Sequence, residues 1–243
     1  MSYIIALFLM IVLYAFGIYL TKYIKNVRIW NYLFSSVVFI LYVSLVSTVY
    51  ADVGPYDWNF QNTLPVANVS PFMFSIVFII QLLPSKIRKH FYLLVSLLCV
   101  GMFLSTVLNC IYNAVIHYRF IKHFLLDYFA HFILSLWGIY LVKTKQVELT
   151  KKNVLISSSI IVGVAAIMVV INLIFDTSFF GLSLRGKHNI YNNVLVDNSY
   201  LSALIYFVGL IGLLVLGYFV CSFVNKRVQN NEKITEDRNK ILI

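Results

Sequence analysis

A carboxylate and an imidazole lie four residues apart inside one apolar stretch of this chain. Asp127 and His131 have the spacing that places two side chains on one face of an α-helix, and Ser135 and Gly138 continue that face. A carboxylate beside an imidazole fixes the tautomer of the ring and raises its basicity, as in hydrolytic triads. The pair therefore predicts a general base, His131, positioned by Asp127.

Seven apolar stretches, each close to the roughly 20 residues that cross a bilayer, carry these side chains. We expect each stretch to be an α-helix, because hydrocarbon offers no partner to an unpaired backbone group, and the alternation typical of a β-barrel is absent. The expected helices are 3–20, 30–50, 65–83, 91–113, 124–142, 154–175 and 199–223. Residues 1–224 are thus predicted to form one all-α integral membrane domain with seven transmembrane helices, and residues 225–243 a polar cytoplasmic tail.

Lysine and arginine fall mainly on one side of this arrangement. The loops after the first, third and fifth helices and the tail hold three, three, four and five of them, which is 15 of the 19 in the chain. Cytoplasmic loops are enriched in Lys and Arg, so these segments are predicted to be cytoplasmic and the amino terminus to be outside. The first helix has basic residues only after it, the reverse of a cleavable signal peptide. We expect a multi-pass protein of a cell membrane, with the bacterial cytoplasmic membrane as the first expectation.

With the amino terminus outside, five helices carry their most polar side chains in the outer half of the membrane. Asn68, Asn109 and Asn172 lie at the same depth as Asp127 and His131. Polar groups in lipid are costly and usually face the bundle interior or a water-filled cavity. The simplest packing that accommodates them is one polar pocket that opens outward. The three asparagines are predicted to bind substrate there and to donate hydrogen bonds to an oxyanion.

Pro71 is expected to interrupt the outer end of the third helix. Proline has no N–H group, so the carbonyl of Ala67 would lack its helical partner. A broken turn over 67–71 would present backbone groups to the same pocket.

The composition excludes the soluble classes of protein. Hydrophobic residues make up 61% of the chain and charged residues 12%, whereas a soluble domain has roughly 45–50% and about 25%. The net charge of +10 comes from the predicted cytoplasmic segments, so nucleic-acid binding is not expected. The cysteines lie in apolar stretches and form no disulfide or metal-binding pattern, and no cofactor motif is present. We predict no metal and no cofactor, and membrane lipid is the expected partner; a membrane-protein partner and the oligomeric state are left open.

Three segments carry motifs in the order and spacing of one family of membrane proteins. The segment 64–70 reads Leu-Pro-Val-Ala-Asn-Val-Ser and opens a helix after an acidic loop with a Trp. The segment 130–142 begins with Ala-His-Phe and ends in Tyr-Leu-Val, and the segment 172–182 begins with Asn and ends in Phe-Phe-Gly-Leu. Over about residues 30 to 222 the chain resembles the YwaF-like family of bacterial integral membrane proteins, which is related to a eukaryotic membrane acyltransferase family.

This resemblance implies acyl transfer between lipids, with a Cys nucleophile and a His base. The family's His corresponds to His131. At the position of the Cys the chain has Val69, with Ser70 beside it, and Ala67 replaces the family's preceding His. The Trp-Pro-Trp-Tyr run before the family's last span reads Asn-Ser-Tyr-Leu at 198–201. The chain therefore resembles a divergent member without the family's Cys, in which Ser70 is the substitute nucleophile.

Three kinds of function are open at this point. The first is acyl transfer on a membrane lipid or a lipid-linked substrate. The second is a non-catalytic accessory or binding subunit, in which His131 and the asparagines hold helices together and Ser70 caps a helix. The third is a small-solute transporter, for which broken helices in two related halves would be expected.

Overall fold

The computed structural model describes residues 2–24, 26–57, 69–116, 121–177, 179–182 and 199–241, and within these ranges every regular element is a helix. The all-α prediction is confirmed for this part of the chain, and each expected span overlaps one observed helix. The helices are α1 (Ser2–Leu20), α2 (Val27–Asp57), α4 (Val69–Leu82), α5 (Ser85–Ile116), α6 (Ile121–Lys143), α7 (Lys151–Phe175) and α8 (Ser199–Ile241). Two short 3-10 turns, η1 (Thr21–Tyr23) and η2 (Phe179–Gly181), follow α1 and α7.

Five of these helices are long and apolar enough to cross a membrane. They are α2, α5, α6, α7 and α8, whose qualifying stretches have 19 to 33 residues. Among the described residues, α1 and α4 contribute shorter apolar stretches, Ile11–Leu20 and Val69–Leu82. Apolar helices of this number and length indicate a membrane-embedded, multi-pass protein.

Helices α5 and α6 form the centre of the bundle. Within their apolar stretches, 61% and 67% of residues are buried, against 22% in each of α2, α7 and α8. The two helices also make the most extensive contact in the fold. The outer helices instead turn large apolar side chains such as Phe175 and Phe219 away from the protein. A helix that is apolar all round is buried by protein at the centre and by lipid at the periphery.

Two glycines let neighbouring helices approach α5 closely. A Cβ atom on Gly138 of α6 would lie 2.7 Å from Cys99 Cβ and 2.8 Å from the carbonyl oxygen of Val95. A Cβ atom on Gly217 of α8 would lie 1.8 Å from the carbonyl oxygen of Leu97. Small residues at such crossings are typical of membrane helices. They let two backbones come into close van der Waals contact, which stabilises helix association where no hydrophobic effect drives it.

Hydroxyl groups join the same helices through hydrogen bonds to backbone carbonyls. Ser96 Oγ on α5 donates to the carbonyl of Gly138 over 3.0 Å, and Ser135 Oγ on α6 donates to the carbonyl of Cys99 over 2.7 Å. Cys221 Sγ on α8 donates to the carbonyl of Ser96 over 3.3 Å. The inward continuation of the Asp127–His131 face therefore packs against α5.

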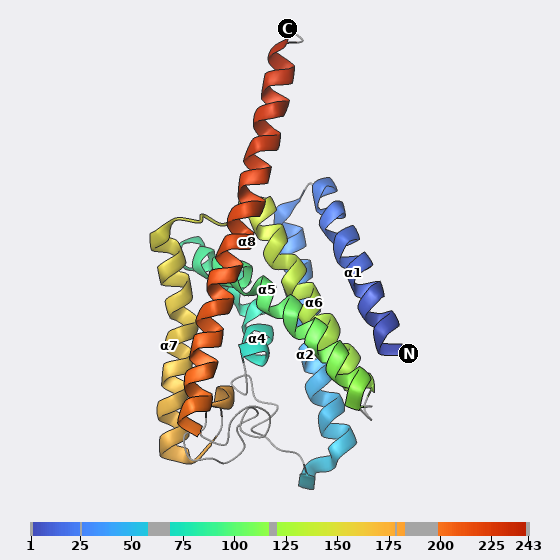
Figure 1. Cartoon of the computed structure of the whole chain (residues 1–243), viewed down its shortest axis with the longest axis vertical. Coiled ribbons are helices and arrows are strands. Elements are labelled where there is room, and N and C mark those ends of the chain that lie inside the picture. Colours follow the sequence, from blue (N-terminus) through green and yellow to red (C-terminus); the bar gives the residue numbers. More distant parts are fainter. Residues whose placement is uncertain are drawn as a thin grey trace.

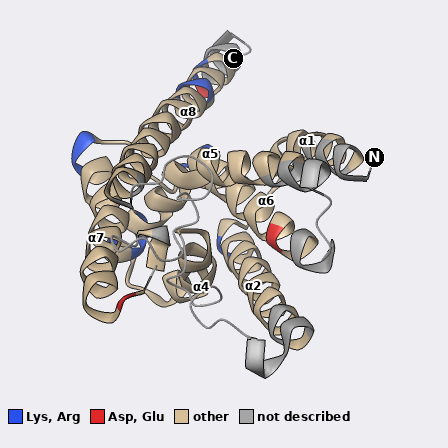
Figure 2. Cartoon of the chain, turned by 60° about the horizontal axis from the view of Figure 1, so that its bottom comes forward, with Lys and Arg blue, Asp and Glu red and all other residues tan. Residues whose placement is uncertain are grey.

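The chain runs up α1, down α2, up α6, down α7 and up α8 in Figure 1. Contacts gather the segments predicted to be cytoplasmic at the upper end. Lys143 Nζ donates to the carbonyl of Ile18 over 2.7 Å, Asn31 Nδ2 donates to Gln146 Oε1 over 2.5 Å, and Lys145 forms an ion pair with Glu232. A small cavity of about 90 Å³ lies between the first turns of α5 and the segment that leads from α6 into α7. It is lined by residues 89, 90, 93, 145, 146, 148 and 153. Figure 2 shows Lys and Arg along the outer part of α8 and beside the start of α7, whereas the helices between are mainly tan.

Two expectations concern helix ends. Helix α4 is described from Val69 and is unbroken from there to Leu82. Residues 65–68 lie outside the described ranges, so the expected break over 67–71 stays a prediction. Helix α8 continues without interruption to Ile241, so the polar tail is a helical continuation of the last span that projects from the bundle (Figure 1).

We expect Gly217→Ala to destabilise the fold strongly. The new methyl group would meet the backbone of Leu97, which cannot move without shifting α5, and overpacking of this kind costs about 1–3 kcal/mol or more. Gly212→Ala is the matched control on the same helix, since no atom lies within 4 Å of its Cβ position. The midpoint of thermal unfolding in detergent measures both. Equal midpoints for the two variants would contradict the close α5–α8 contact.

Candidate functional site

His131 is the residue around which the predicted catalytic residues gather. It lies on α6 with 4% of its surface exposed, and its Nε2 atom lies 2.8 Å from Ser70 Oγ on α4. Its Nδ1 atom lies 2.8 Å from the backbone carbonyl oxygen of Asp127 and 3.3 Å from the carboxylate oxygen Oδ1 of the same residue. The structure thus brings Ser70, His131 and Asp127 into one hydrogen-bonded series. The catalytic roles of the three residues stay predictions.

The partners of His131 assign its tautomer. Both oxygens that face Nδ1 are acceptors, so Nδ1 carries the hydrogen. In the neutral ring Nε2 is then an acceptor, and the Ser70 hydroxyl donates to it. This is the tautomer in which an imidazole can take a proton from a serine hydroxyl.

Helix α4 holds Ser70 at the start of its first turn. The next contact of Ser70 Oγ is Met102 Sδ on α5 at 3.7 Å, and a thioether is a much weaker acceptor than an imidazole nitrogen. Four residues further along the same helix face, the ring of Phe74 meets the His131 ring edge-on, with 4.8 Å between centroids. One face of α4 therefore both presents the hydroxyl and packs the imidazole in place.

Asp127 acts from a less enclosed position than His131. Its side chain is 30% exposed, against 5% for the side chain of His131. Its carbonyl and its carboxylate both approach Nδ1, so the backbone fixes the ring even if the carboxylate is partly solvated. The carboxylate is close enough to stabilise positive charge that develops on the ring.

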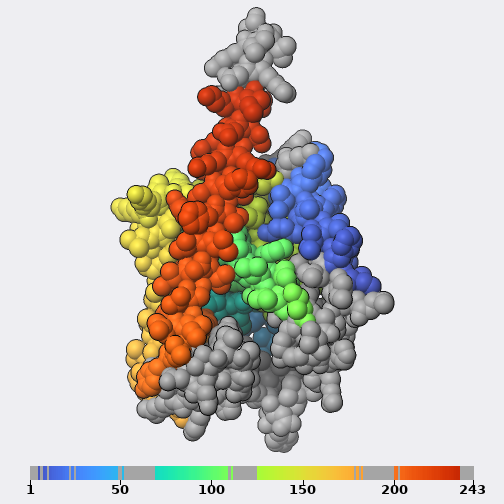
Figure 3. All heavy atoms as spheres, in the orientation of Figure 1, coloured from blue at the N-terminus to red at the C-terminus, as the bar shows by residue number. Residues whose placement is uncertain are grey.

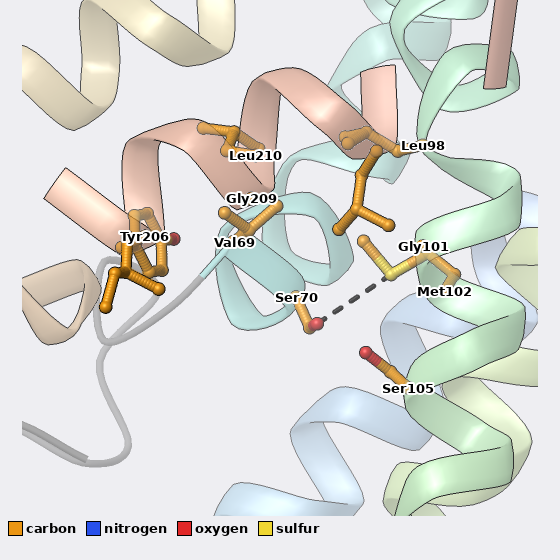
Figure 4. Close-up of a pocket in the computed structure, with 11 residues that line it drawn as sticks. Val69, Ser70, Leu98, Gly101, Met102, Ser105, Tyr206, Gly209 and Leu210 are labelled. Atoms are coloured by element: carbon orange, nitrogen blue, oxygen red, sulfur yellow. Dashed lines mark hydrogen bonds between the residues drawn. The ribbon is translucent and has the colours of Figure 1, made fainter. Parts of the chain in front are cut away.

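Ser70 also lies on the wall of a cavity of about 310 Å³ between α4, α5 and α8 (Figure 4). The lining is mainly apolar, with hydroxyl groups from Ser70, Ser105 and Tyr206. The remaining lining residues are Val69, Leu98, Gly101, Met102, Ile205, Gly209, Leu210 and Leu213. His131 and Asp127 lie behind Ser70 and do not line this cavity. It therefore differs from the polar pocket expected from residue depth.

The three predicted substrate-binding asparagines lie elsewhere or outside the description. Asn172 is buried at the end of α7, where its Oδ1 accepts from Thr177 Oγ1 and from the Phe179 N–H, each over 2.8 Å. Its Nδ2 donates to the carbonyl of Phe179 over 2.8 Å. The Asn172 amide is thus hydrogen-bonded within the turn that follows α7. Asn68 lies outside the described residues, and Asn109 lies on α5 with its side chain outside the description.

Sequence reasoning missed the residues that surround the Ser70–His131 contact. Phe74, which packs against the His131 ring, could have been found, because it follows Ser70 by four residues and so shares its helix face. Met102 and Tyr206, which line the cavity with Ser70, carry no comparable signal, because the sequence does not reveal which helices border α4. Among the described residues, no three His, Cys, Asp or Glu side chains gather closely enough to hold a metal ion.

The fold and this site define the class: a multi-pass helical membrane protein with a hydrogen-bonded Ser–His–Asp series beside an apolar cavity. No family model, no curated protein and no solved structure matches the chain.

We expect Ser70 and His131 to be energetically coupled in a double-mutant cycle. Ser70→Ala and His131→Ala each remove the same interhelical hydrogen bond, so the pair should show a coupling of about 0.5–2 kcal/mol in the free energy of unfolding. Unfolding of the purified protein in bicelles measures it. Ser105→Ala paired with His131→Ala is the control, because Ser105 lines the same cavity without a described bond to His131. Additivity within about 0.3 kcal/mol for Ser70 would contradict the bond.

Proposed function

We propose that all seven helices cross the membrane, with the amino terminus outside and the basic end of the bundle in the cytoplasm. The bias of 15 of 19 Lys and Arg residues supports this orientation, as do the contacts that gather those segments at one end. The described part of α4 has 14 residues and is about 21 Å long, so residues 65–68 would complete that span. His131 is ten residues from the start of α6, about 15 Å along the helix. Its site would thus lie in the outer half of the membrane.

The two ends of α8 should be reached from opposite sides of the membrane. Tyr200→Cys and Asn230→Cys both introduce a thiol at an exposed position of this helix. A membrane-impermeant maleimide should label the first in intact cells and the second only after permeabilisation. Both variants are made in a Cys110→Ser background, and that background alone is the control, since the two remaining cysteines, Cys99 and Cys221, are buried. Labelling of both thiols from the same side would contradict the proposed orientation.

We propose further that the protein transfers an acyl group between membrane lipids or lipid-linked molecules. The observation that supports this is the hydrogen-bonded series from Asp127 through His131 to Ser70, with the ring in the tautomer that accepts the serine proton. The cavity next to Ser70 is lined mainly by apolar side chains, which suits the hydrocarbon chain of an acyl donor. The resemblance to the YwaF-like family, which is related to a membrane acyltransferase family, implies the same chemistry.

In the first half of the proposed reaction, Ser70 Oγ attacks the ester carbonyl carbon of the acyl donor. The serine proton passes to His131 Nε2, and the Asp127 carboxylate stabilises the imidazolium. The tetrahedral intermediate then releases the donor's alcohol, which takes the proton from Nε2. The acyl group is left as an ester on Ser70.

In the second half, the acceptor's hydroxyl loses its proton to His131 Nε2 and attacks the Ser70 ester. Collapse of the second tetrahedral intermediate returns the proton from Nε2 to Ser70 Oγ and releases the new ester. Each oxyanion needs donors. Asn68 and Asn109 stay the predicted donors.

A non-catalytic role as an accessory or binding subunit is the second candidate. The observation that favours it is that the Ser70–His131 bond also fastens α4 to α6, as the Ser96 and Ser135 bonds fasten α6 to α5. Interhelical hydrogen bonds of this kind are common in membrane proteins and need no chemistry.

Acyl transfer predicts a lipid change that depends on Ser70 and His131 together. Cells that express the intact protein should differ from empty cells in acyl-chain distribution, and Ser70→Ala or His131→Ala should lower that activity by about 10²-fold or more. Comparative lipid mass spectrometry at matched membrane levels measures it. A fluorophosphonate probe should label the intact protein and leave Ser70→Ala unlabelled.

Two further variants separate chemistry from packing. Ser105→Ala removes a hydroxyl from the same cavity and should leave the lipid change intact, and Ser70→Cys keeps a nucleophile beside His131 and should retain part of the activity. Lipid profiles that match in the intact protein, Ser70→Ala and His131→Ala would overturn the acyltransferase proposal and favour the accessory role.

A further inference from the structure

A second and larger cavity, the basic-end groove, lies between α1 and α8. It is near the end of the bundle at which the basic segments gather. Its volume is about 590 Å³, and α5 and α6 form its floor with residues such as Cys99, Phe103 and Ile139. In Figure 3, α8 and α1 stand apart and the two central helices are visible between them. The walls come from Tyr14 and Ile18 of α1 and from residues 220–231 of α8. This groove is separate from the cavity beside Ser70, with which it shares no lining residue.

Polarity changes along the groove from one end to the other. Deep in the membrane region the lining is apolar, and at the basic end it ends in Lys143, Arg227 and Asn231. No lining residue is acidic. Lys143 is held at the rim by its bonds to the carbonyl of Ile18 and to Thr21 Oγ1, and the Arg227 guanidinium lies over the Phe223 ring, 4.5 Å from its centroid.

The change from an apolar to a basic lining matches a phospholipid, which has an apolar acyl chain and a charged headgroup. From Val220 to Arg227 the wall on α8 covers about 10 Å along the helix, about two thirds of the hydrocarbon depth of one leaflet. An apolar groove on the membrane face of a protein is filled by hydrocarbon, because water gains no hydrogen bonds there. A fixed guanidinium and an ammonium at the headgroup level recognise a phosphate group, with Arg able to bind it in bidentate fashion.

We propose that this groove is a binding site for one anionic phospholipid, whose acyl chain lies between α1 and α8 and whose phosphate meets Arg227 and Lys143. The proposal rests on the membrane placement of the helices and is independent of acyl transfer. The bound lipid would complete the surface between two helices that scarcely touch each other, and α1 would be held to the bundle partly through it.

Native mass spectrometry of protein extracted from equimolar phosphatidylglycerol and phosphatidylcholine vesicles tests the proposal. We expect one phosphatidylglycerol to be retained per protein, in preference to phosphatidylcholine. Arg227→Gln should lower that preference about fivefold, the effect of one cation near an anionic headgroup. Lys226→Gln is the matched control, because Lys226 is the neighbouring cation and does not line the groove. It should change the preference by less than about twofold.

A filling substitution tests the groove without changing the charge. Val224→Trp places a large ring in the groove and should abolish retention of the lipid, whereas Val215→Trp, at an exposed position of α8 outside the groove, should leave it unchanged. Equal retention of the two lipids by the intact protein would overturn the proposal. Equal effects of Arg227→Gln and Lys226→Gln would also overturn it, because they would indicate general attraction to the basic surface. Retention of the lipid by a folded Val224→Trp variant would do the same.

Discussion

The close packing of α5 against α6 and α8 is the constraint on which the rest of the structure depends. In hydrocarbon, a polar group without a partner is costly, so hydroxyls and carbonyls must meet inside the protein. Glycines at 138 and 217 bring the backbones together, and Ser96 and Ser135 then donate to carbonyls of the facing helix. The same face of α6 continues toward the start of the helix, to His131 and Asp127. The contact between α5 and α6 thereby also fixes where the candidate base lies along α6 and which face of the helix carries it.

The candidate site adds one short helix, α4, to the packed pair α5 and α6. Ser70 is the second residue of the described part of α4, and its hydroxyl lies against His131 Nε2. The ring is held from three sides, by the Asp127 carbonyl and carboxylate, by Ser70 and by the edge of Phe74. A structural hydrogen bond needs only one of these contacts. The combination of a fixed tautomer with a serine next to an open cavity is what makes acyl transfer the better-supported function.

Much of the fold could be predicted from the sequence, because lipid imposes both a length and a polarity on each span. Helix ends were harder, because the hydropathy of the last span falls at about residue 223 while α8 continues through the polar tail to Ile241. The Asp127–His131 pair follows from helix periodicity. The Ser70–His131 contact joins residues 61 apart, and periodicity cannot predict it. Asn172 shows the opposite problem, because its side chain is used by a turn whose geometry depends on left-handed backbone at Asp176 and Phe180.

Helix α8 borders both hollows in the bundle with one stripe of residues. Residues 205, 206, 209, 210 and 213 line the cavity beside Ser70, and residues 220 to 231 line the basic-end groove. Between them lies Gly217, whose close approach to Leu97 is continued by Leu213 against Gly101 and by the bond from Cys221 to the Ser96 carbonyl. This packed stretch of α8 and α5 keeps the two hollows apart, and they share no lining residue. Both linings are mainly apolar, but their polar groups differ: one has hydroxyls such as that of Ser70, and the other has the cations Arg227 and Lys143. The same pair of helices thus bounds two apolar hollows with different polar chemistry at their margins.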